Sequence, residues 1–341
     1  MDTTGPGALP LPDLALRTHG GTVVWANDEL FAGRENLITP GPATFTPQTF
    51  GAKGQVYDGW ETRRRRDRTP DSRDEAIVRL GLPGVVRTLV VDTSHFTGNY
   101  PVEAAVEAVC LDGTPSVDEL RTAQWSTLVE RAALKGDAPN TFEVSSGRRW
   151  THVRLAIYPD GGVARLRVHG EPVPDPDLLE ALRTVDLAAL EHGGTVVGCS
   201  NLYYGSPLRL IAPGVARSMR EGWETARRRD DGNDWVELRL ACEGVLRVAE
   251  LDTTWFLGNA PGAAALSARD AAGGVWQPLL ARTPLQPDTR HRFKVDASSG
   301  GPATEVRLDI YPDGGMARLR LWGTPTEAGL AALRTRWDAT S

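Results

Sequence analysis

Short apolar stretches run through most of the chain. They are rich in β-branched residues, often alternate with polar ones, and predict β-strands. They cover residues 76–80, 85–91, 153–157 and 164–168, and again 236–240, 245–251, 306–310 and 317–321. Turn residues lie between them: Leu82-Pro83-Gly84, and Pro-Asp-Gly-Gly at 159–162 and 312–315. We expect the last two to be hairpin tips, in which glycine supplies the positive φ between two strands.

Two segments have helical spacing instead. Leucines and other apolar residues recur at intervals of three or four within 176–190 and within 326–337. Each segment follows one set of predicted strands. We expect a helix in each, the first of them linking the two halves of the chain.

Three sequence blocks occur twice in the same order. Residues 59–67 (GWETRRRRD) return at 222–230 as GWETARRRD, residues 157–162 (IYPDGG) return at 310–315, and residues 19–24 (HGGTVV) return at 192–197. This order indicates an internal duplication. The first copy is the longer, and its extra residues fall between the shared blocks, where loops are expected. Each copy is long enough to bury its own core.

We therefore predict an all-β fold of two tandem jelly-roll-like antiparallel β-sandwich domains, each followed by a short helix. The predicted boundaries are a flexible N-terminal arm at 1–17, the first repeat at 18–172, a linker helix at 173–190, and the second repeat with its C-terminal helix at 191–341. The arm is expected because its sequence is rich in Pro and Gly.

Composition and charge limit the classes of partner that the protein is expected to bind. A net charge of -6 and a pI of about 5.6 argue against nucleic acid as the main partner, although Arg63 to Arg66 is a local exception. The chain has no stretch typical of a signal peptide or a membrane span, so we expect a cytoplasmic protein without membrane contact. Its cysteines, Cys110, Cys199 and Cys242, are too few and too scattered for a disulfide framework or a Cys-rich metal site.

The block from Asp58 to Arg64 combines two carboxylates, an indole and several guanidinium groups. Arg63 or Arg64 can hold a carboxylate through two parallel hydrogen bonds, and Glu61 can accept N–H bonds or transfer a proton. If the segment is extended, Glu61 and Arg63 share a face, which favours Arg63. Asp58 and Trp60 complete this group of candidate binding residues. The alternative, which spacing alone favours, is a solvated charged segment with Trp60 in the core.

A second polar cluster, Asp92 to Tyr100, follows a strongly apolar predicted strand. Sites often gather at strand ends, so we take Asp92 and His95 as candidates for proton transfer and Asn99 and Tyr100 as candidates for binding. The alternatives are a turn-capping role for Asp92 and a surface position for His95. Only the first copy has Asp58, His95 and Tyr100 together, so we expect the principal site there.

With these blocks in place, the chain resembles the allantoicase family from about Gly20 to Gly323. The resemblance is carried by residues 20–24, 26–32, 35–38, 58–64, 92–99 and the two IYPDGG blocks. It implies a pair of jelly-roll domains, assembly into homo-oligomers, and hydrolysis of allantoate to ureidoglycolate and urea. The family's motifs carry over to Asp58 through Arg64 and to Asp92, Thr93, Phe96, Gly98 and Asn99. The copies also differ: Asp234-Trp235 keeps the family pattern where the first copy has Asp74-Glu75.

The sequence leaves the function and the cofactor open. The alternative function is a non-catalytic β-sandwich that binds a ligand or serves in assembly, because such folds often bind without catalysis. Members of the family have been linked to divalent ions, so the resemblance raises the question of a metal. No residue spacing in the chain is typical of a particular metal site, and no cofactor is assigned.

Overall fold

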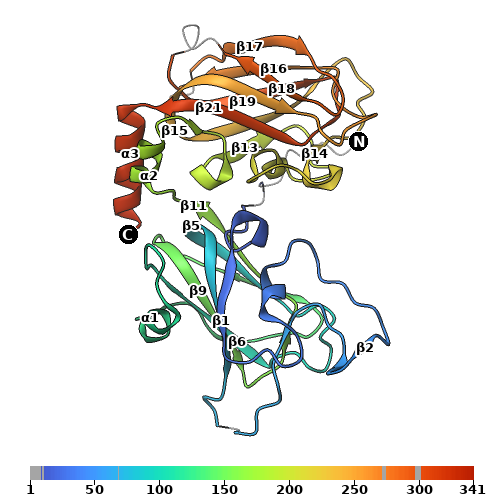
Figure 1. Ribbon diagram of the computed structural model, residues 1–341, viewed down its shortest axis with the longest axis vertical. Coiled ribbons are helices and arrows are strands. Elements are labelled where there is room, and N and C mark those ends of the chain that lie inside the picture. The colour runs from blue at the N-terminus through green and yellow to red at the C-terminus, as the bar shows by residue number, and fades with distance from the viewer. Residues whose placement is uncertain (1–8, 10, 68, 271–273, 296–300) are drawn as a thin grey trace. The chain divides into compact units, whose positions relative to one another are not determined.

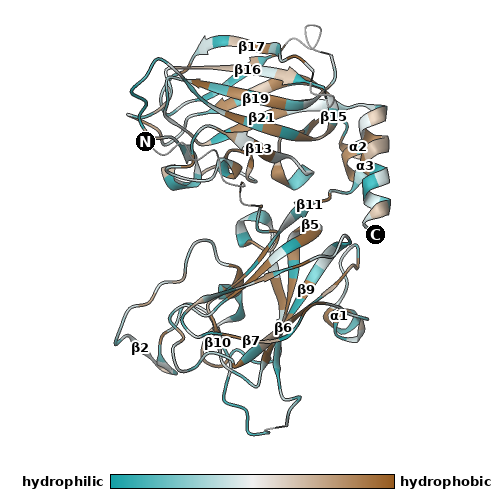
Figure 2. Cartoon of the chain, turned by 180° about the vertical axis from the view of Figure 1, so that it is seen from behind, coloured by the Kyte–Doolittle hydropathy of each residue, from teal (hydrophilic) through white to brown (hydrophobic). Residues whose placement is uncertain are grey.

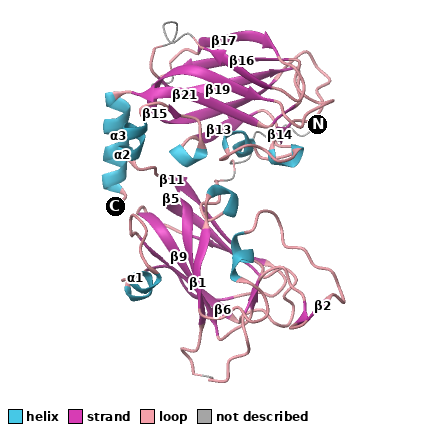
Figure 3. Ribbon diagram, viewed as in Figure 1, coloured by secondary structure: helices cyan, strands magenta, loops and turns pink. Residues whose placement is uncertain are grey.

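The chain folds into two compact units, residues 11–171 and 172–339 (Figure 1). The computed structural model describes residues 9, 11–67, 69–270, 274–295 and 301–341. Both units consist mainly of strands (Figure 3), and each holds one copy of the duplicated sequence. The predicted all-β fold of two tandem sandwich domains is thus confirmed. None of the described helices is long and apolar enough to cross a membrane.

The first domain contains strands β1 to β11 and one α-helix. The strands are β1 (Thr22–Ala26), β2 (Phe50–Gly51), β3 (Gly54–Gln55), β4 (Trp60–Glu61), β5 (Asp74–Asp92), β6 (Glu103–Val109), β7 (Ser126–Ala133), β8 (Pro139–Glu143), β9 (Arg149–Tyr158), β10 (Gly162–Val163) and β11 (Arg165–Pro172). The helices are α1 (Val117–Thr122) and the 3-10 turns η1 (Arg17–His19) and η2 (Arg34–Ile38).

The second domain repeats this order. Its strands are β12 (Val185–Asp186), β13 (Thr195–Cys199), β14 (Trp223–Glu224), β15 (Asp234–Asp252), β16 (Ala263–Arg269), β17 (Gln277–Pro284), β18 (Arg290–Lys294), β19 (Ala303–Tyr311), β20 (Gly315–Met316) and β21 (Arg318–Pro325). Its helices are α2 (Pro176–Leu182), α3 (Glu327–Ala339) and the 3-10 turns η3 (Leu190–His192), η4 (Pro207–Ile211) and η5 (Met219–Glu221).

One long strand joins the two layers of each sandwich. The first half of β5 pairs with β1 and β9, and its second half pairs with β8 and β11. The register shifts between Arg79 and Gly84, as a bulge allows when a strand changes sheets. The turn predicted at Leu82-Pro83-Gly84 is therefore wrong, since proline, which lacks an N–H, is tolerated at such a bulge. β15 behaves in the same way, with its shift between Arg239 and Gly244.

The Pro-Asp-Gly-Gly turns do not form the hairpins that we predicted. Gly161 has φ 141° and Gly314 has φ 133°, so the chain does turn at both places. The strand after the first turn, β10, pairs with β4 and not with β9, and β20 pairs with β14 in the same way. Local sequence identifies a turn but not the partner of the strand that follows it. The actual pairing brings Gly161 next to the GWETRRRRD block.

Two predicted boundaries need correction. The helix expected over 176–190 begins at its N-cap Asp175 but ends at Leu182, because Arg183 leaves helical geometry with φ 62°. β12 then pairs with β21, and Arg334 of α3 forms ion pairs with α2, so α2 is part of the second domain and not a free linker. In the expected arm, Leu14 is fully buried and donates its backbone N–H to Val168. Residues 11–16 are therefore packed, while 1–8 and 10 lie outside the described residues.

Apolar side chains form a separate core in each domain. Figure 2 shows hydrophobic residues concentrated on the strands of both domains and polar residues in the loops. Near the duplicated motifs, Phe96 is fully buried against Ala43 and Ala164, and Tyr57 and Tyr100 pack on this group. Phe256 has the same position in the second domain. These aromatic residues support the loops that surround the sites described next.

Candidate functional site

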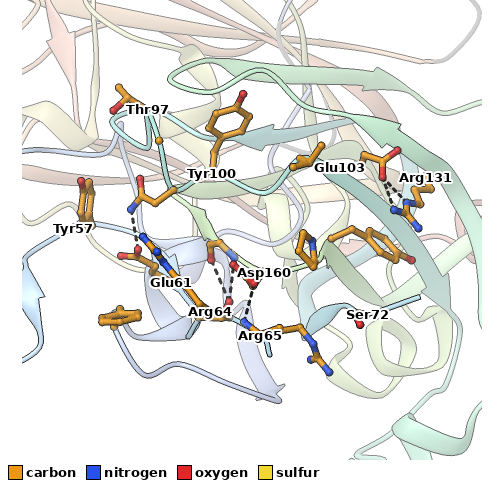
Figure 4. Close-up of a pocket in the computed structure, with 18 of the residues that line it drawn as sticks. Tyr57, Glu61, Arg64, Arg65, Ser72, Thr97, Tyr100, Glu103, Arg131 and Asp160 are labelled. Carbon is orange, nitrogen blue, oxygen red and sulfur yellow. Dashed lines mark hydrogen bonds and ion pairs between the residues drawn. The ribbon is translucent and has the colours of Figure 1, made fainter. Parts of the chain in front are cut away.

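A cavity of about 1080 Å³ opens in the first domain where β4, the turn after β9 and the loop after β5 meet (Figure 4). Its lining includes charged, amide and aromatic side chains. They come from Phe31, Tyr57, Glu61, Thr62, Arg64, Arg65, Thr69, Pro70, Ser72, Thr97, Gly98, Asn99, Tyr100, Val102, Glu103, Arg131, Tyr158, Pro159, Asp160 and Gly161. Four of the predicted site residues are among them: Glu61, Arg64, Asn99 and Tyr100.

The pairing of β4 with β10 sets the floor of this cavity. Trp60 lies opposite Val163, and Glu61 lies opposite Gly162. The Trp60 side chain is fully buried and donates its indole N–H to the carbonyl of Asp28 at 2.7 Å. Because side chains alternate along a strand, burying Trp60 turns Glu61 toward the cavity. Trp60, a predicted substrate contact, is therefore a core residue, as the alternative in the sequence analysis held.

Glu61 and Asn99 form a side-chain pair in the cavity. The Asn99 amide donates to Oε1 of Glu61 at 2.8 Å, which Figure 4 marks with a dashed line. Burial raises the pKa of Glu61, and the hydrogen bond from Asn99 acts in the opposite direction. A half-buried carboxylate with a raised pKa is suited to proton transfer near neutral pH.

Arg65 is fully engaged in structural contacts. Its backbone N–H donates to Asp160 at 2.8 Å, and its guanidinium forms ion pairs with Asp67 at 2.8 Å and with Asp74 at 2.7 Å. Asp74 is buried at the start of β5, so this network ties the arginine run to the sheet. Although Arg65 lines the cavity, its charge is already compensated.

Arg63 and Arg64 differ in their side-chain contacts. Asp28 accepts the backbone N–H of Arg63 at 2.9 Å and forms an ion pair with its guanidinium. Arg64, between these two anchored arginines, has no side-chain hydrogen bond or ion pair with any residue that the structure describes. The expectation that Arg63 faces the site with Glu61 is wrong, because β4 ends at Glu61 and strand alternation does not continue beyond it.

Asp58 and Asp92 lie outside the lining of this cavity. Asp58 forms an ion pair with the buried Arg165 at 2.8 Å and accepts the backbone N–H of Thr44. Asp92 caps a turn, accepting the backbone N–H of Ser94 at 2.9 Å and its hydroxyl at 2.6 Å. Both carboxylates hold loops in place, and we assign them no contact with a ligand.

His95 also lies outside the lining. It stacks on Phe45, with ring centroids 5.6 Å apart, and its Nε2 is 3.2 Å from the carbonyl oxygen of Ala43. In the second domain Trp255 takes this position and donates its indole N–H to the carbonyl of Ala216. A histidine and a tryptophan with equivalent hydrogen bonds point to a structural role, so we do not carry His95 forward as an acid or base.

Sequence reasoning missed one wall of the cavity. Arg131 forms an ion pair with Glu103 at 2.5 Å and lies over the ring of Tyr158, 4.1 Å from its centroid. The loop residues Thr69 and Pro70 also line the cavity, and the corresponding loop of the second copy is shorter. That difference in loop length is one signal in the sequence. Arg131 has a counterpart in the second copy, Arg282, which lies over Tyr311 at 4.0 Å from the ring centroid, but both arginines lie outside the three repeated blocks.

The carboxylates in the cavity do not form a set of metal ligands. Asp160 is bound to the Arg65 backbone and Glu103 to Arg131, which leaves Glu61 bound only to an amide. Among residues 9, 11–67, 69–270, 274–295 and 301–341, no three His, Cys, Asp or Glu side chains gather closely enough to hold a metal ion. These side chains do not fit a resident divalent ion, and we derive no step through one.

Comparison with known proteins matches nearly the whole chain to one family. A sequence model described as the allantoicase repeat matches residues 12–173 and 185–326. A protein of Nocardia farcinica named "Probable allantoicase" is 58% identical over 318 residues, 93% of this chain and 95% of that protein. One of Streptomyces avermitilis with the same name is 51% identical over 335 residues, 96% and 89% of the two chains. The crystal structure of allantoicase from Saccharomyces cerevisiae has a TM-score of 0.77 at 30% identity and covers 92% of each chain.

Proposed function

Because the chain belongs to the allantoicase family, we propose that it hydrolyses allantoate to ureidoglycolate and urea in the cavity of its first domain. Two relatives named as allantoicases match it over nearly their full length, which favours the enzyme over a non-catalytic binding or assembly protein. The observation that carries the proposal is one cavity that contains both the Glu61–Asn99 pair and Arg64, a guanidinium that no described residue engages.

Allantoate has one carboxylate and two ureido groups on a single carbon. Of the three arginines that line the cavity, Arg64 has no side-chain partner among the residues that the structure describes, and its fork geometry matches a carboxylate. Asn99 offers an amide carbonyl to the N–H groups of a ureido arm while its amide nitrogen holds Glu61. Tyr57 and Tyr100 supply flat walls for the planar arms. In this arrangement the carboxylate is the anchor, and the central carbon lies toward Glu61.

Glu61 is the proton-transfer group in the proposed reaction. A water molecule loses a proton to the Glu61 carboxylate as its oxygen bonds to the central carbon, and the bond from that carbon to one ureido nitrogen breaks. Glu61 then returns the proton to the departing nitrogen, which leaves as urea. One carboxylate thus serves as base and then as acid, which suits a raised pKa. The products are urea and ureidoglycolate, with no net gain or loss of protons.

Matched variants of the two repeats test this assignment. We expect Glu61→Gln to lower kcat by ~100-fold or more, since proton transfer contributes at least that much. Arg64→Lys should mainly raise KM, because it weakens binding of the carboxylate. Urea release from allantoate by the purified chain is the measurement, and Glu224→Gln and Arg227→Lys are the matched controls. Absence of urea release by the parent would reject the function. Loss of turnover in Glu224→Gln together with its retention in Glu61→Gln would place catalysis in the other repeat.

We also propose that the protein acts in the cytoplasm as a homo-oligomer. The cysteines at 110, 199 and 242 are all free thiols, which fits a reducing compartment. Large apolar side chains remain exposed on the single chain, including Phe50 and Leu257, and such groups often mark subunit interfaces. Sedimentation equilibrium of the purified chain tests the assembly: a monomer at micromolar concentration would contradict it.

A further inference from the structure

The second domain has a cavity of its own, about 750 Å³ in volume. It lies where β14, the turn after β19 and the loop after β15 meet, so its place in the fold is equivalent to that of the first cavity. Its lining consists of Tyr203, Tyr204, Glu224, Thr225, Ala226, Arg227, Arg228, Arg229, Gly258, Asn259, Ala260, Pro312, Asp313 and Gly314.

The polar floor of this second cavity repeats the main contacts of the first. Asn259 donates to Oε1 of Glu224 at 2.7 Å, as Asn99 does to Glu61. Arg228 donates its backbone N–H to Asp313 at 2.7 Å and forms an ion pair with the buried Asp234 at 2.9 Å. The second domain therefore keeps the same half-buried carboxylate and amide above the same anchored arginine.

Arg227 completes this floor. Like Arg64, it follows an anchored residue and precedes an anchored arginine, because Asn201 accepts the backbone N–H of Ala226 at 3.3 Å. Within the part of the chain that the structure describes, the Arg227 side chain has no hydrogen bond or ion pair. A second guanidinium thus borders a cavity beside a carboxylate–amide pair.

The walls, by contrast, have diverged. Ala260 stands where the first domain has Tyr100, and Tyr204 stands where it has Phe31. Tyr203 and Tyr204 meet edge to face, with ring centroids 4.5 Å apart, and both are largely exposed. Arg282 lies over Tyr311, 4.0 Å from the ring centroid, as Arg131 lies over Tyr158, but neither Arg282 nor Tyr311 lines this cavity. The second cavity therefore has the same polar floor as the first but different walls.

We propose that the second cavity is a separate binding site for a small carboxylate with one ureido group. Arg227 holds the carboxylate, and the Glu224–Asn259 pair holds the ureido N–H and carbonyl groups. This cavity is smaller than the first, about 750 Å³ against about 1080 Å³, which suits a ligand with a single ureido arm. This ligand class rests on the proposed function of the first cavity, and each chain thus holds two molecules of ligand, one in each domain.

Hydantoate is the probe, because it has one carboxylate and one ureido group but no second ureido arm to be displaced. Equilibrium dialysis of labelled hydantoate against the full-length parent should give two molecules bound per chain at saturation. Arg227→Ala should lower this value to one, and the matched variant Arg64→Ala should also lower it to one. Both arginines are exposed, so truncation should preserve the fold, and thermal melting checks this.

Other outcomes would overturn the proposal. One molecule per chain that is unaffected by Arg227→Ala would mean that the second cavity is empty. One molecule that is lost in either variant would mean that the two arginines do not define two separate sites. No binding at all would also reject the second site. Urea release by the parent separates the two claims: if allantoate is hydrolysed but hydantoate binds once, only the second site fails, whereas no hydrolysis contradicts the proposed function itself.

Discussion

At the scale of single residues, the ion pairs around a run of arginines decide which arginine can bind a ligand. The run Arg63-Arg64-Arg65 presents three similar guanidinium groups, but Asp28 engages the first, and Asp67 and Asp74 engage the third. Among the arginines that line the cavity, only Arg64 keeps a charge that no described residue compensates. The same selection occurs at Ala226-Arg227-Arg228, where an alanine replaces the first arginine and the middle residue again has no ion pair with any residue that the structure describes.

The two copies differ at the ion pair next to the cavity arginine, and this difference suggests a double-variant test of how Arg64 is positioned. The Asp28–Arg63 pair of the first domain is replaced by Asn201 and Ala226 in the second. We expect Asp28→Asn to raise KM by about three- to fivefold, the scale of an exposed ion pair, because an unpaired Arg63 then competes with Arg64 for the carboxylate. Adding Arg63→Ala should restore KM, since asparagine still accepts the backbone N–H. Steady-state kinetics of the single and double variants decide it, and a double variant worse than the single one would contradict the coupling.

Asn99 should control the pH dependence of turnover through Glu61. Burial raises the pKa of Glu61, and the Asn99 hydrogen bond stabilises the ionised form. As the base, Glu61 must be ionised, so kcat/KM falls as the pH drops through this pKa. Removing the hydrogen bond in Asn99→Ala raises the pKa further and should move the acid limb of the pH–rate profile to higher pH. A limb that stays in place or moves to lower pH would argue against Glu61 as the base. Asn259→Ala is the matched control.

At the scale of elements, β9 contains a buried histidine that links stability to pH. His152 is 2% exposed, and its Nδ1 shares a hydrogen bond with the hydroxyl of Thr151 at 2.9 Å. Burial and the nearby charge of Arg79 lower its pKa to about 4. The corresponding strand β19 has Glu305 at this position and no histidine. The two domains should therefore respond differently to acid.

The sign of the effect follows from linkage. Between pH 6.5 and 4 the unfolded chain binds a proton at His152 that the folded chain does not, so stability falls as the pH falls. From pH 7.5 to 5 this costs about 2 kcal/mol, because one pKa unit corresponds to about 1.4 kcal/mol. Urea denaturation at both pH values should show that His152→Gln loses less stability on acidification than the parent. Equal losses in the two proteins would show that His152 already binds a proton in the folded state.

At the scale of the whole molecule, the duplication provides each domain with its own core. Phe96 and Phe256 are fully buried in equivalent clusters. Either phenylalanine-to-alanine variant should lose roughly 3–5 kcal/mol of stability, the usual cost of such a core truncation. Calorimetric scans should show the loss confined to the transition of the altered domain. A single transition shifted equally by both variants would mean that the two units unfold together.

The two substitutions should differ in their effect on activity. Phe96 stacks on Tyr57 of the first cavity, with ring centroids 4.7 Å apart, so Phe96→Ala should reduce urea release at temperatures where the protein is still folded. Phe256 supports only the second domain, and Phe256→Ala should retain turnover under the same conditions. Loss of turnover in Phe256→Ala alone would move catalysis to the second repeat.

The sequence by itself determined the duplication, the β-sandwich class and the family, because these depend on the order of motifs and on periodicity along the chain. It also singled out Glu61, Arg64, Asn99 and Tyr100 among the candidates. It did not separate them from neighbours with similar chemistry, such as Asp58 and Arg63.

Only the tertiary structure decided which groups face the cavity. Trp60 is buried because β4 pairs with β10, and Arg63 is held by Asp28, which is distant in sequence. The Pro-Asp-Gly-Gly turn brings Asp160 to the arginine run through a strand pairing that local sequence does not encode. The physical reason is that an ionised side chain takes its role from the charge and burial around it, and these come from residues brought together by folding.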